Sequence, residues 1–157
     1  MKTLFMPELA RIVERFDSKG DCLNYMTELL SSSGCLSFPD RYLAAVKGRE
    51  EIMSTGIGRG IAIPHARDLT VSCLKIAVCK MASPLDFNSV DNQPVNLVFM
   101  IAVPQNSNQE YMQILRSLSE QLRQDEIRAQ LLCAKSDMEL YEHVRKIEDI
   151  INRPRAD

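Results

Sequence analysis

The residue types best suited to chemistry gather in one segment of the chain, between residues 49 and 67. His65 follows Pro64 directly, at the carboxyl end of a short apolar run, Ile61–Ile63. In α/β proteins, ligands and reacting groups collect at the carboxyl ends of strands. The same segment holds two hydroxyl side chains and two guanidiniums: Arg49, Ser54, Thr55 and Arg67. Hydroxyls and guanidiniums beside an imidazole are suited to binding a phosphoryl group.

Three glycines at alternate positions, Gly56, Gly58 and Gly60, precede the histidine. Their spacing matches neither GxGxxG nor a Walker loop, because no glycine stands three positions after Gly58 and no Lys-Ser/Thr pair follows. Two interpretations stay open at this point. The glycines can form a bend between a helix and a strand, with His65 an ordinary structural histidine, or they can expose backbone N–H groups to a phosphoryl group.

Other reaction classes find little support in the sequence. Five cysteines are scattered without a CxxC pair and only two histidines are present, so we expect no metal site. A serine hydrolase is not indicated, since no GxSxG motif occurs. The second histidine, His143, is interpreted as a surface residue of a helix near the C-terminal end.

Charge and hydropathy narrow the class of partner. The chain has 19 Lys and Arg against 21 Asp and Glu, a formal net charge of −2, which does not favour nucleic acid or an anionic membrane. No apolar run approaches the roughly 20 residues of a membrane helix. Glu8 and Arg11 interrupt the N-terminal segment too early for a signal peptide. We therefore expect a cytoplasmic protein that neither binds nucleic acid nor inserts into a membrane.

Hydrophobic periodicity predicts the elements that must position these residues. We expect strands over 11–16, 61–63, 74–81 and 95–103, and helices over 18–30, 37–47, 109–122, 125–133 and 136–147. Ser37 is the expected N-cap of the second helix, and Ser136 with Glu139 fits a capping box at the start of the last one. Because the long strands are continuously apolar, both of their faces should be covered. The prediction is an α/β single domain over residues 1–150, with a mixed β-sheet sandwiched between helical layers, and a polar tail over 151–157.

The chemistry-bearing segment is also similar to a known family signature. Arg49-Glu50, STGIG at residues 54–58 and GIAIPH at residues 60–65 all fit it. This run resembles the active-site signature of the enzyme IIA domain of the bacterial phosphoenolpyruvate-dependent sugar phosphotransferase system (PTS), in its fructose, mannitol and nitrogen-regulatory type. DNQPV at residues 91–95 fits too and favours the nitrogen-regulatory and fructose branches. The likeness covers about residues 4–144, and it implies the mannitol-type enzyme IIA fold.

The resemblance implies a role for several residues. His65 matches the histidine that accepts a phosphoryl group from HPr, the histidine-containing phosphocarrier protein, and passes it to a cysteine of an enzyme IIB partner. Through enzyme IIB the group reaches an incoming sugar at the membrane enzyme IIC. Arg49 matches the active-site arginine and Thr55 a hydroxyl beside the phosphohistidine, with Ser54 a second candidate for binding phosphate. Because HPr delivers the phosphoryl group, this phosphotransferase component needs no cofactor.

Tyr111 marks a departure from the family pattern. Many members carry a second histidine near the reactive one, at the start of the helix after the strand over 95–103, and Tyr111 stands at the corresponding position. A phenol donates a hydrogen bond to a phosphoryl oxygen but stays neutral near pH 7. Tyr111 is therefore a candidate phosphate-binding residue that brings no second cationic contact.

The expected mechanism sets conditions that a structure can check. A neutral imidazole is the nucleophile, and Arg49 should disfavour its protonated form. Because donor and acceptor are both proteins, His65 should be exposed in a shallow site with an apolar rim; the candidates for the rim are Ile57, Ile61 and Met112. A domain without phosphate chemistry would instead bury His65.

Two functions fit this mechanism. The favoured one is phosphoryl transfer for sugar uptake. The alternative is a regulatory protein of the nitrogen PTS type, whose phosphorylation state controls partner binding without sugar transport.

Overall fold

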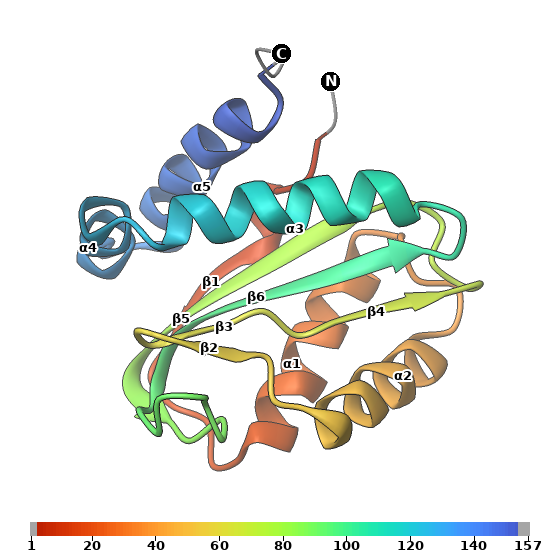
Figure 1. The fold of residues 1–157 in the computed structure, drawn as a ribbon, viewed down its shortest axis with the longest axis horizontal. Helices are drawn as coiled ribbons and strands as arrows, with labels where there is room; N and C mark the ends of the chain where they lie inside the picture. Colours follow the sequence, from red (N-terminus) through yellow and green to blue (C-terminus); the bar gives the residue numbers. More distant parts are fainter. Residues whose placement is uncertain (1–2, 154–157) are drawn as a thin grey trace.

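A mixed β-sheet lies between two layers of helices in the computed structural model, which describes residues 3–153 (Figure 1). In chain order its elements are η1 (Pro7–Leu9), β1 (Ala10–Val13), α1 (Lys19–Ser32), α2 (Pro39–Ile52), β2 (Gly56–Gly58), β3 (Ile61–Ala62), β4 (His65–Asp68), β5 (Lys75–Leu85), β6 (Val95–Pro104), α3 (Asn108–Leu122), α4 (Asp125–Cys133) and α5 (Asp137–Ile151). Helices α1 and α2 cover one face of the sheet, and α3 and α5 cover the other. The predicted α/β fold with helical layers on both sides of a mixed sheet is confirmed.

The sheet is built around an antiparallel pair, β5 and β6. Strand β1 lies parallel to β5, and β2 pairs antiparallel with β3. On the other side of β6, β3 pairs in parallel with Leu97 and Val98, and β4 pairs in parallel with residues 101–104. Strands β3 and β4 therefore pair with successive stretches of the same edge of β6. The break between them falls at Ile63 and Pro64, directly before the histidine.

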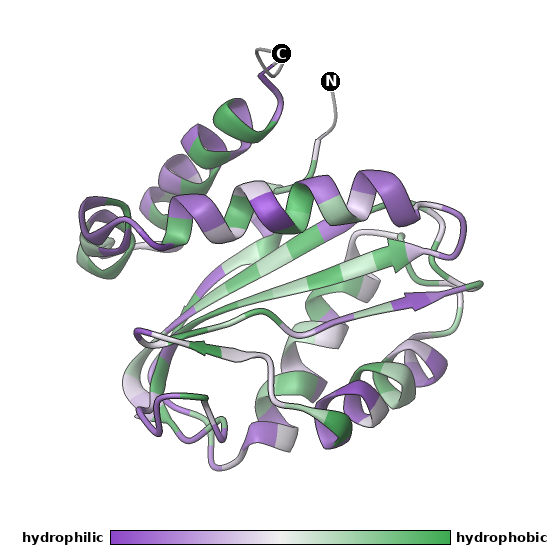
Figure 2. Ribbon diagram, in the orientation of Figure 1, coloured by the Kyte–Doolittle hydropathy of each residue, from purple (hydrophilic) through white to green (hydrophobic). Residues whose placement is uncertain are grey.

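Two hydrophobic clusters lie on opposite faces of the sheet, because successive strand residues point to opposite sides. On β6, Phe99 and Ile101 join the cluster shared with α3, α4 and α5, whereas Val98 and Met100 join the cluster shared with α1 and α2. The strands are hydrophobic along their length, and the helices are hydrophobic mainly towards the sheet (Figure 2). Both faces of the long strands are covered, as their continuous apolar character predicts. Among residues 3–153, no helix is long and apolar enough to cross a membrane.

Helix α2 differs from the prediction at both ends. Its N-cap is Phe38 rather than Ser37, and no side chain caps it; Pro39 begins the helix, where its missing N–H costs nothing. The helix also runs past Lys47 to Ile52, since no residue in that stretch breaks it. As a result Arg49 is held by the last helical turn rather than by a loop. The predicted cap of α5 is confirmed, because Ser136 Oγ accepts the Glu139 N–H at 3.1 Å.

Strands β2 and β4 were not expected from the sequence, since the glycines suggest a bend and Pro64 suggests the end of a strand. Proline lacks only the donor, however, and the Pro64 carbonyl still accepts the Ile101 N–H at 2.9 Å. The sheet therefore resumes at His65. At the other end of the chain, α5 runs past the predicted end at residue 147 to Ile151. Residues 154–157 of the predicted tail lie outside the described part.

One buried hydrogen bond joins α2 to the strand beside the histidine: the fully buried Tyr42 hydroxyl donates to the Ile101 carbonyl at 2.7 Å. We expect Tyr42→Phe to lower the free energy of unfolding by about 1 kcal/mol, because the carbonyl loses its donor while the ring volume is kept. Urea unfolding measures the change. The control is Tyr25→Phe on a partly buried ring of α1, which should change stability by no more than a few tenths of that. Equal stabilities of the two variants would contradict the role of this bond.

Candidate active site

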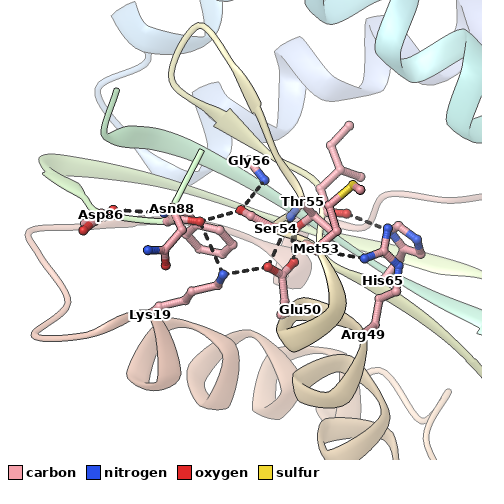
Figure 3. Close-up of polar contacts among 12 residues, drawn as sticks. Lys19, Arg49, Glu50, Met53, Ser54, Thr55, Gly56, His65, Asp86 and Asn88 are labelled. Atoms are coloured by element: carbon pink, nitrogen blue, oxygen red, sulfur yellow. Dashed lines mark hydrogen bonds and ion pairs between the residues drawn. The ribbon is translucent and has the colours of Figure 1, made fainter. Parts of the chain in front are cut away.

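The histidine ring is held by its own backbone. His65 is half-buried at the start of β4, and its Nδ1 lies 2.8 Å from the carbonyl oxygen of Ile63, two residues earlier (Figure 3). A carbonyl oxygen only accepts hydrogen bonds, so Nδ1 must carry the ring proton. The lone pair of the neutral ring is then on Nε2. The break between β3 and β4 thus selects the nitrogen that is able to act as a nucleophile.

The surroundings of the ring keep it neutral. Burial is the main cause that lowers the pKa of His65 below its ordinary value, and the Arg49 guanidinium lowers it further. The hydrogen bond to Ile63 and the Glu50 carboxylate act in the opposite direction. Arg49 extends from the last turn of α2 and donates from Nη1 to the Met53 carbonyl at 2.8 Å, which fixes the guanidinium beside the ring (Figure 3). The expectation that Arg49 disfavours the imidazolium agrees with this direction.

The lowered pKa predicts a specific response to acid. His65 should titrate below the ordinary value of about 6.5 in an NMR titration of the folded protein. Because the unfolded chain binds this proton first, the contribution of His65 to the free energy of unfolding should fall as the pH drops from about 6.5 through the folded pKa. Urea unfolding at several pH values measures this, and His65→Ala should remove that part of the pH dependence. A titration midpoint at or above the ordinary value would contradict the prediction.

Thr55 and Ser54, the two candidate phosphate-binding hydroxyls, form hydrogen bonds within the protein. The Thr55 side chain is 5% exposed, and its hydroxyl donates to the Glu50 carboxylate. The Ser54 hydroxyl donates to the Phe87 carbonyl and accepts the Gly56 N–H at 3.0 Å. Both side chains therefore order the segment before the histidine, and their binding of phosphate stays a prediction.

The three glycines occupy positions that a side chain would disturb. A Cβ on Gly56 would overlap the Ser89 side chain, with the Ser89 Cβ only 2.9 Å away. Gly58, Arg59 and Gly60 form the turn between β2 and β3 and all have positive φ, at 97°, 58° and 79°. Asp91 accepts the Arg59 N–H at 3.0 Å and so closes this turn. The DNQPV segment thus belongs to the framework of the glycine turn.

Tyr111 lies next to the His65 ring, as its expected position requires. The centroids of the Tyr111 and His65 rings are 5.5 Å apart, and the ring planes are tilted by 43°. Tyr111 comes from the first turn of α3 and is 7% exposed. Burial raises its pKa, while Arg49 and Arg67 act in the opposite direction. Arg67 is exposed on β4 and donates to Asn108 Oδ1 at 3.1 Å, so a second guanidinium faces this side of the site.

The predicted apolar rim is present in part. Ile57 and Met112 are exposed, whereas Ile61 is buried in the core because it is paired with β6. Sequence reasoning missed two strongly exposed apolar residues after Arg49, namely Ile52 and Met53. Their apolar character directly before the Ser54-Thr55 pair was the available signal. Within residues 3–153, no three His, Cys, Asp or Glu side chains come together as a group that could hold a metal ion.

Comparison with known proteins adds independent evidence. Residues 3–147 match the family model described as phosphoenolpyruvate-dependent sugar phosphotransferase system, EIIA 2. The chain belongs to this family. The resemblance based on residues 49–65 is therefore confirmed, and the EIIA 2 model covers nearly all of the described structure.

Both sugar-specific and regulatory proteins are among the relatives of this EIIA 2 chain. It is 34% identical over 136 residues to a fructose-specific EIIA component of Haloferax volcanii, which covers 87% of the chain and 88% of that protein. It is 39% identical over 135 residues to a fructose-specific EIIABC component of Bacillus subtilis, covering 86% of the chain but only 20% of that longer protein. A nitrogen regulatory protein of Escherichia coli is 34% identical over 134 residues, covering 83% of the chain and 80% of that protein.

Solved structures show the same architecture. The nitrogen regulatory protein IIA-Ntr of Neisseria meningitidis superimposes with a TM-score of 0.80 at 30% identity, covering 92% of this chain and 95% of that one. The mannitol enzyme IIA of Escherichia coli, solved in complex with phosphorylated enzyme IIB, has a TM-score of 0.74 at 24% identity, covering 91% of this chain and 99% of that one. The second likeness supports the mannitol-type fold that the sequence predicts.

Proposed function

We propose that this chain is a phosphoryl carrier of the PTS, in which His65 accepts a phosphoryl group from phosphorylated HPr and passes it to a cysteine of an enzyme IIB partner for sugar uptake. The observation that carries the proposal is the hydrogen bond from His65 Nδ1 to the Ile63 carbonyl, because it leaves the Nε2 lone pair free. The ring is half-buried rather than buried, so a domain without phosphate chemistry is not favoured.

The transfer needs no proton donor, because His65 keeps its Nδ1 proton in both steps. The Nε2 lone pair attacks the phosphorus atom, the P–Nε2 bond forms, and the P–N bond of phosphorylated HPr breaks as its histidine leaves with the electron pair. His65 keeps its Nδ1 proton, so the ring becomes positively charged while the phosphoryl oxygens are negative. The enzyme IIB thiolate then attacks phosphorus, and His65 leaves as the neutral ring. The Arg49 guanidinium is the group best placed to neutralise the phosphoryl oxygens during both steps.

The surface around His65 suits brief encounters with protein partners. Two exposed apolar side chains belong to segments that reach the site: Met53, whose carbonyl accepts from Arg49, and Met112, which follows Tyr111 on α3. Flexible methionine side chains adapt to more than one partner surface, which a carrier between a donor and an acceptor requires. The complex of mannitol enzyme IIA with phosphorylated enzyme IIB supports enzyme IIB as the acceptor. These encounters would take place in the cytoplasm, with enzyme IIC contacted only through enzyme IIB.

A regulatory role is the second candidate. It is favoured by the 34% identity to the nitrogen regulatory protein of Escherichia coli and by the TM-score of 0.80 to IIA-Ntr. In that role His65 is phosphorylated in the same way, and the added negative charge at the apolar rim changes which partner binds.

One experiment separates the two candidates. The chain is incubated with enzyme I, HPr and labelled phosphoenolpyruvate, and a fructose-type enzyme IIB is then added. A role in sugar uptake predicts that the chain becomes labelled and that the label then moves to the cysteine of enzyme IIB. Label that enters but stays on the chain favours the regulatory role. Label that never enters contradicts both.

A further inference from the structure

A buried carboxylate, Glu50, lies near enough to the reactive histidine to act on its charge. The Glu50 side chain is 4% exposed and pairs with Lys19 Nζ at 2.7 Å. Lys19 is fixed in turn by the Phe87 carbonyl at 3.3 Å and by the Phe87 ring, 4.6 Å from its centroid. Removing two charges from water is costly, and replacing such a pair with apolar residues often stabilises a protein. Stability alone is therefore a weak reason for this pair.

A series of hydrogen bonds, joined through the backbone of Thr55 and of Ile63, leads from this carboxylate to the histidine. Glu50 accepts the Thr55 N–H at 3.2 Å and also the Thr55 hydroxyl. The Thr55 carbonyl accepts the Ile63 N–H at 3.0 Å. The Ile63 carbonyl then accepts the Nδ1–H of His65 at 2.8 Å. Figure 3 shows Glu50 between Lys19 on one side and Thr55 on the other, with His65 and Arg49 beyond Thr55.

These contacts fix the position of the last acceptor. The N–H and C=O of Thr55 belong to different peptide groups, as do those of Ile63, so the hydrogen bonds hold the two carbonyls in place rather than pass charge along the backbone. An Ile63 carbonyl held in place keeps the proton on Nδ1, and the Glu50 carboxylate favours positive charge on the ring. Arg49 opposes that charge from the other side of the site. Arg49 and Glu50 thus act on His65 in opposite directions.

We propose that Glu50 is a positioning residue for phosphoryl transfer: it holds the backbone of Thr55 and Ile63 so that the proton of His65 stays on Nδ1, and its negative charge stabilises the positive charge that the ring acquires when Nε2 is phosphorylated. This inference rests on the proposed function only for the phosphorylated state. Its statement about the free ring is independent of any transfer.

The test compares Glu50→Gln with a matched control, Glu51→Gln. Both remove one carboxylate from the last turns of α2, but Glu51 is exposed and takes no part in the path. Three quantities are measured: the distribution of the His65 proton between Nδ1 and Nε2 by ¹⁵N NMR, the pH midpoint of His65, and the rate of label uptake from phosphorylated HPr. Circular dichroism and urea unfolding report whether each variant is folded.

Glu50→Gln should shift part of the His65 population to the Nε2–H tautomer, move the midpoint to lower pH and slow label uptake about tenfold, as loss of a group that orients a functional histidine does elsewhere. Glu51→Gln should leave all three quantities as in the unaltered chain. The other charged or titratable groups that act on His65 or lie beside it, Arg49, Arg67 and Tyr111, are unchanged in both variants.

Three outcomes would overturn the inference. One is a Glu50→Gln variant that matches the control. Another is slower uptake with no change in tautomer or midpoint, because a merely structural role would act in that way. The third needs no variant: NMR of the unaltered chain that finds the proton on Nε2 contradicts the path even if Glu50→Gln does not fold. Failure of the proposed function is seen separately, as absence of label in the unaltered chain.

Discussion

His65→Ala should take up no label from phosphorylated HPr under conditions in which the unaltered chain is fully labelled. The expected loss is complete rather than partial, because the substitution removes the atom that forms the bond to phosphorus. The fold should survive, since the ring is half-buried and its hydrogen bond to the Ile63 carbonyl is worth only about 1 kcal/mol. Label uptake is followed by electrophoresis at neutral pH, and urea unfolding checks stability.

The matched control uses the other histidine of the chain. His143 lies on α5, on the opposite face of the sheet from α2, and lines a small hollow with residues of α4 and α5. His143→Ala should therefore be labelled like the unaltered chain. Label on the His65→Ala variant would contradict the assignment of the phosphorylated residue. Loss of label in both variants would point to a defect outside the site.

Arg49→Ala should slow label uptake about 100-fold, which is the scale seen when one preorganised donor to a developing anion is removed. The guanidinium is fixed by its hydrogen bond to the Met53 carbonyl, so it does not have to be ordered when the phosphoryl group arrives. Loss of this nearby cation should also raise the pKa of His65 towards its ordinary value, because Arg49 lowers it. Initial rates of uptake at several pH values measure both effects.

A second variant, Arg49→Lys, separates the effect of the positive charge from that of the guanidinium geometry. It keeps the positive charge but not the fork of N–H donors, so its rate should lie between those of Arg49→Ala and the unaltered chain. The midpoint of the His65 titration should stay close to that of the unaltered chain, since the charge is retained. An Arg49→Ala variant that takes up label at the normal rate would contradict the role of the guanidinium in phosphate stabilisation.

Much of this protein is readable from local patterns. The continuous apolar strands over 74–81 and 95–103 require cover on both faces, and that requirement alone predicts the layered α/β fold. The Ser136 cap is likewise local, because a cap depends on residues three positions apart. Arg49 and His65 stand out because a guanidinium and an imidazole share one glycine-rich segment, whose likeness to the EIIA 2 family is confirmed over residues 3–147.

The active form of the histidine was decided by contacts that no local pattern encodes. Strand β4 exists because β6 offers hydrogen-bonding partners beyond Pro64, and this pairing places the Ile63 carbonyl against Nδ1. The contact between Tyr111 and His65 joins α3 to β4 across 46 positions of sequence (111 − 65).

Glu50 stands in the family signature, but its role is not readable from the sequence, because its effect depends on burial beside Lys19 of another helix. Residue types and spacing determined which chemistry the chain is suited to. Long-range packing decided which nitrogen carries the proton and which charges act on the ring, since burial and hydrogen-bond partners are properties of the folded chain alone.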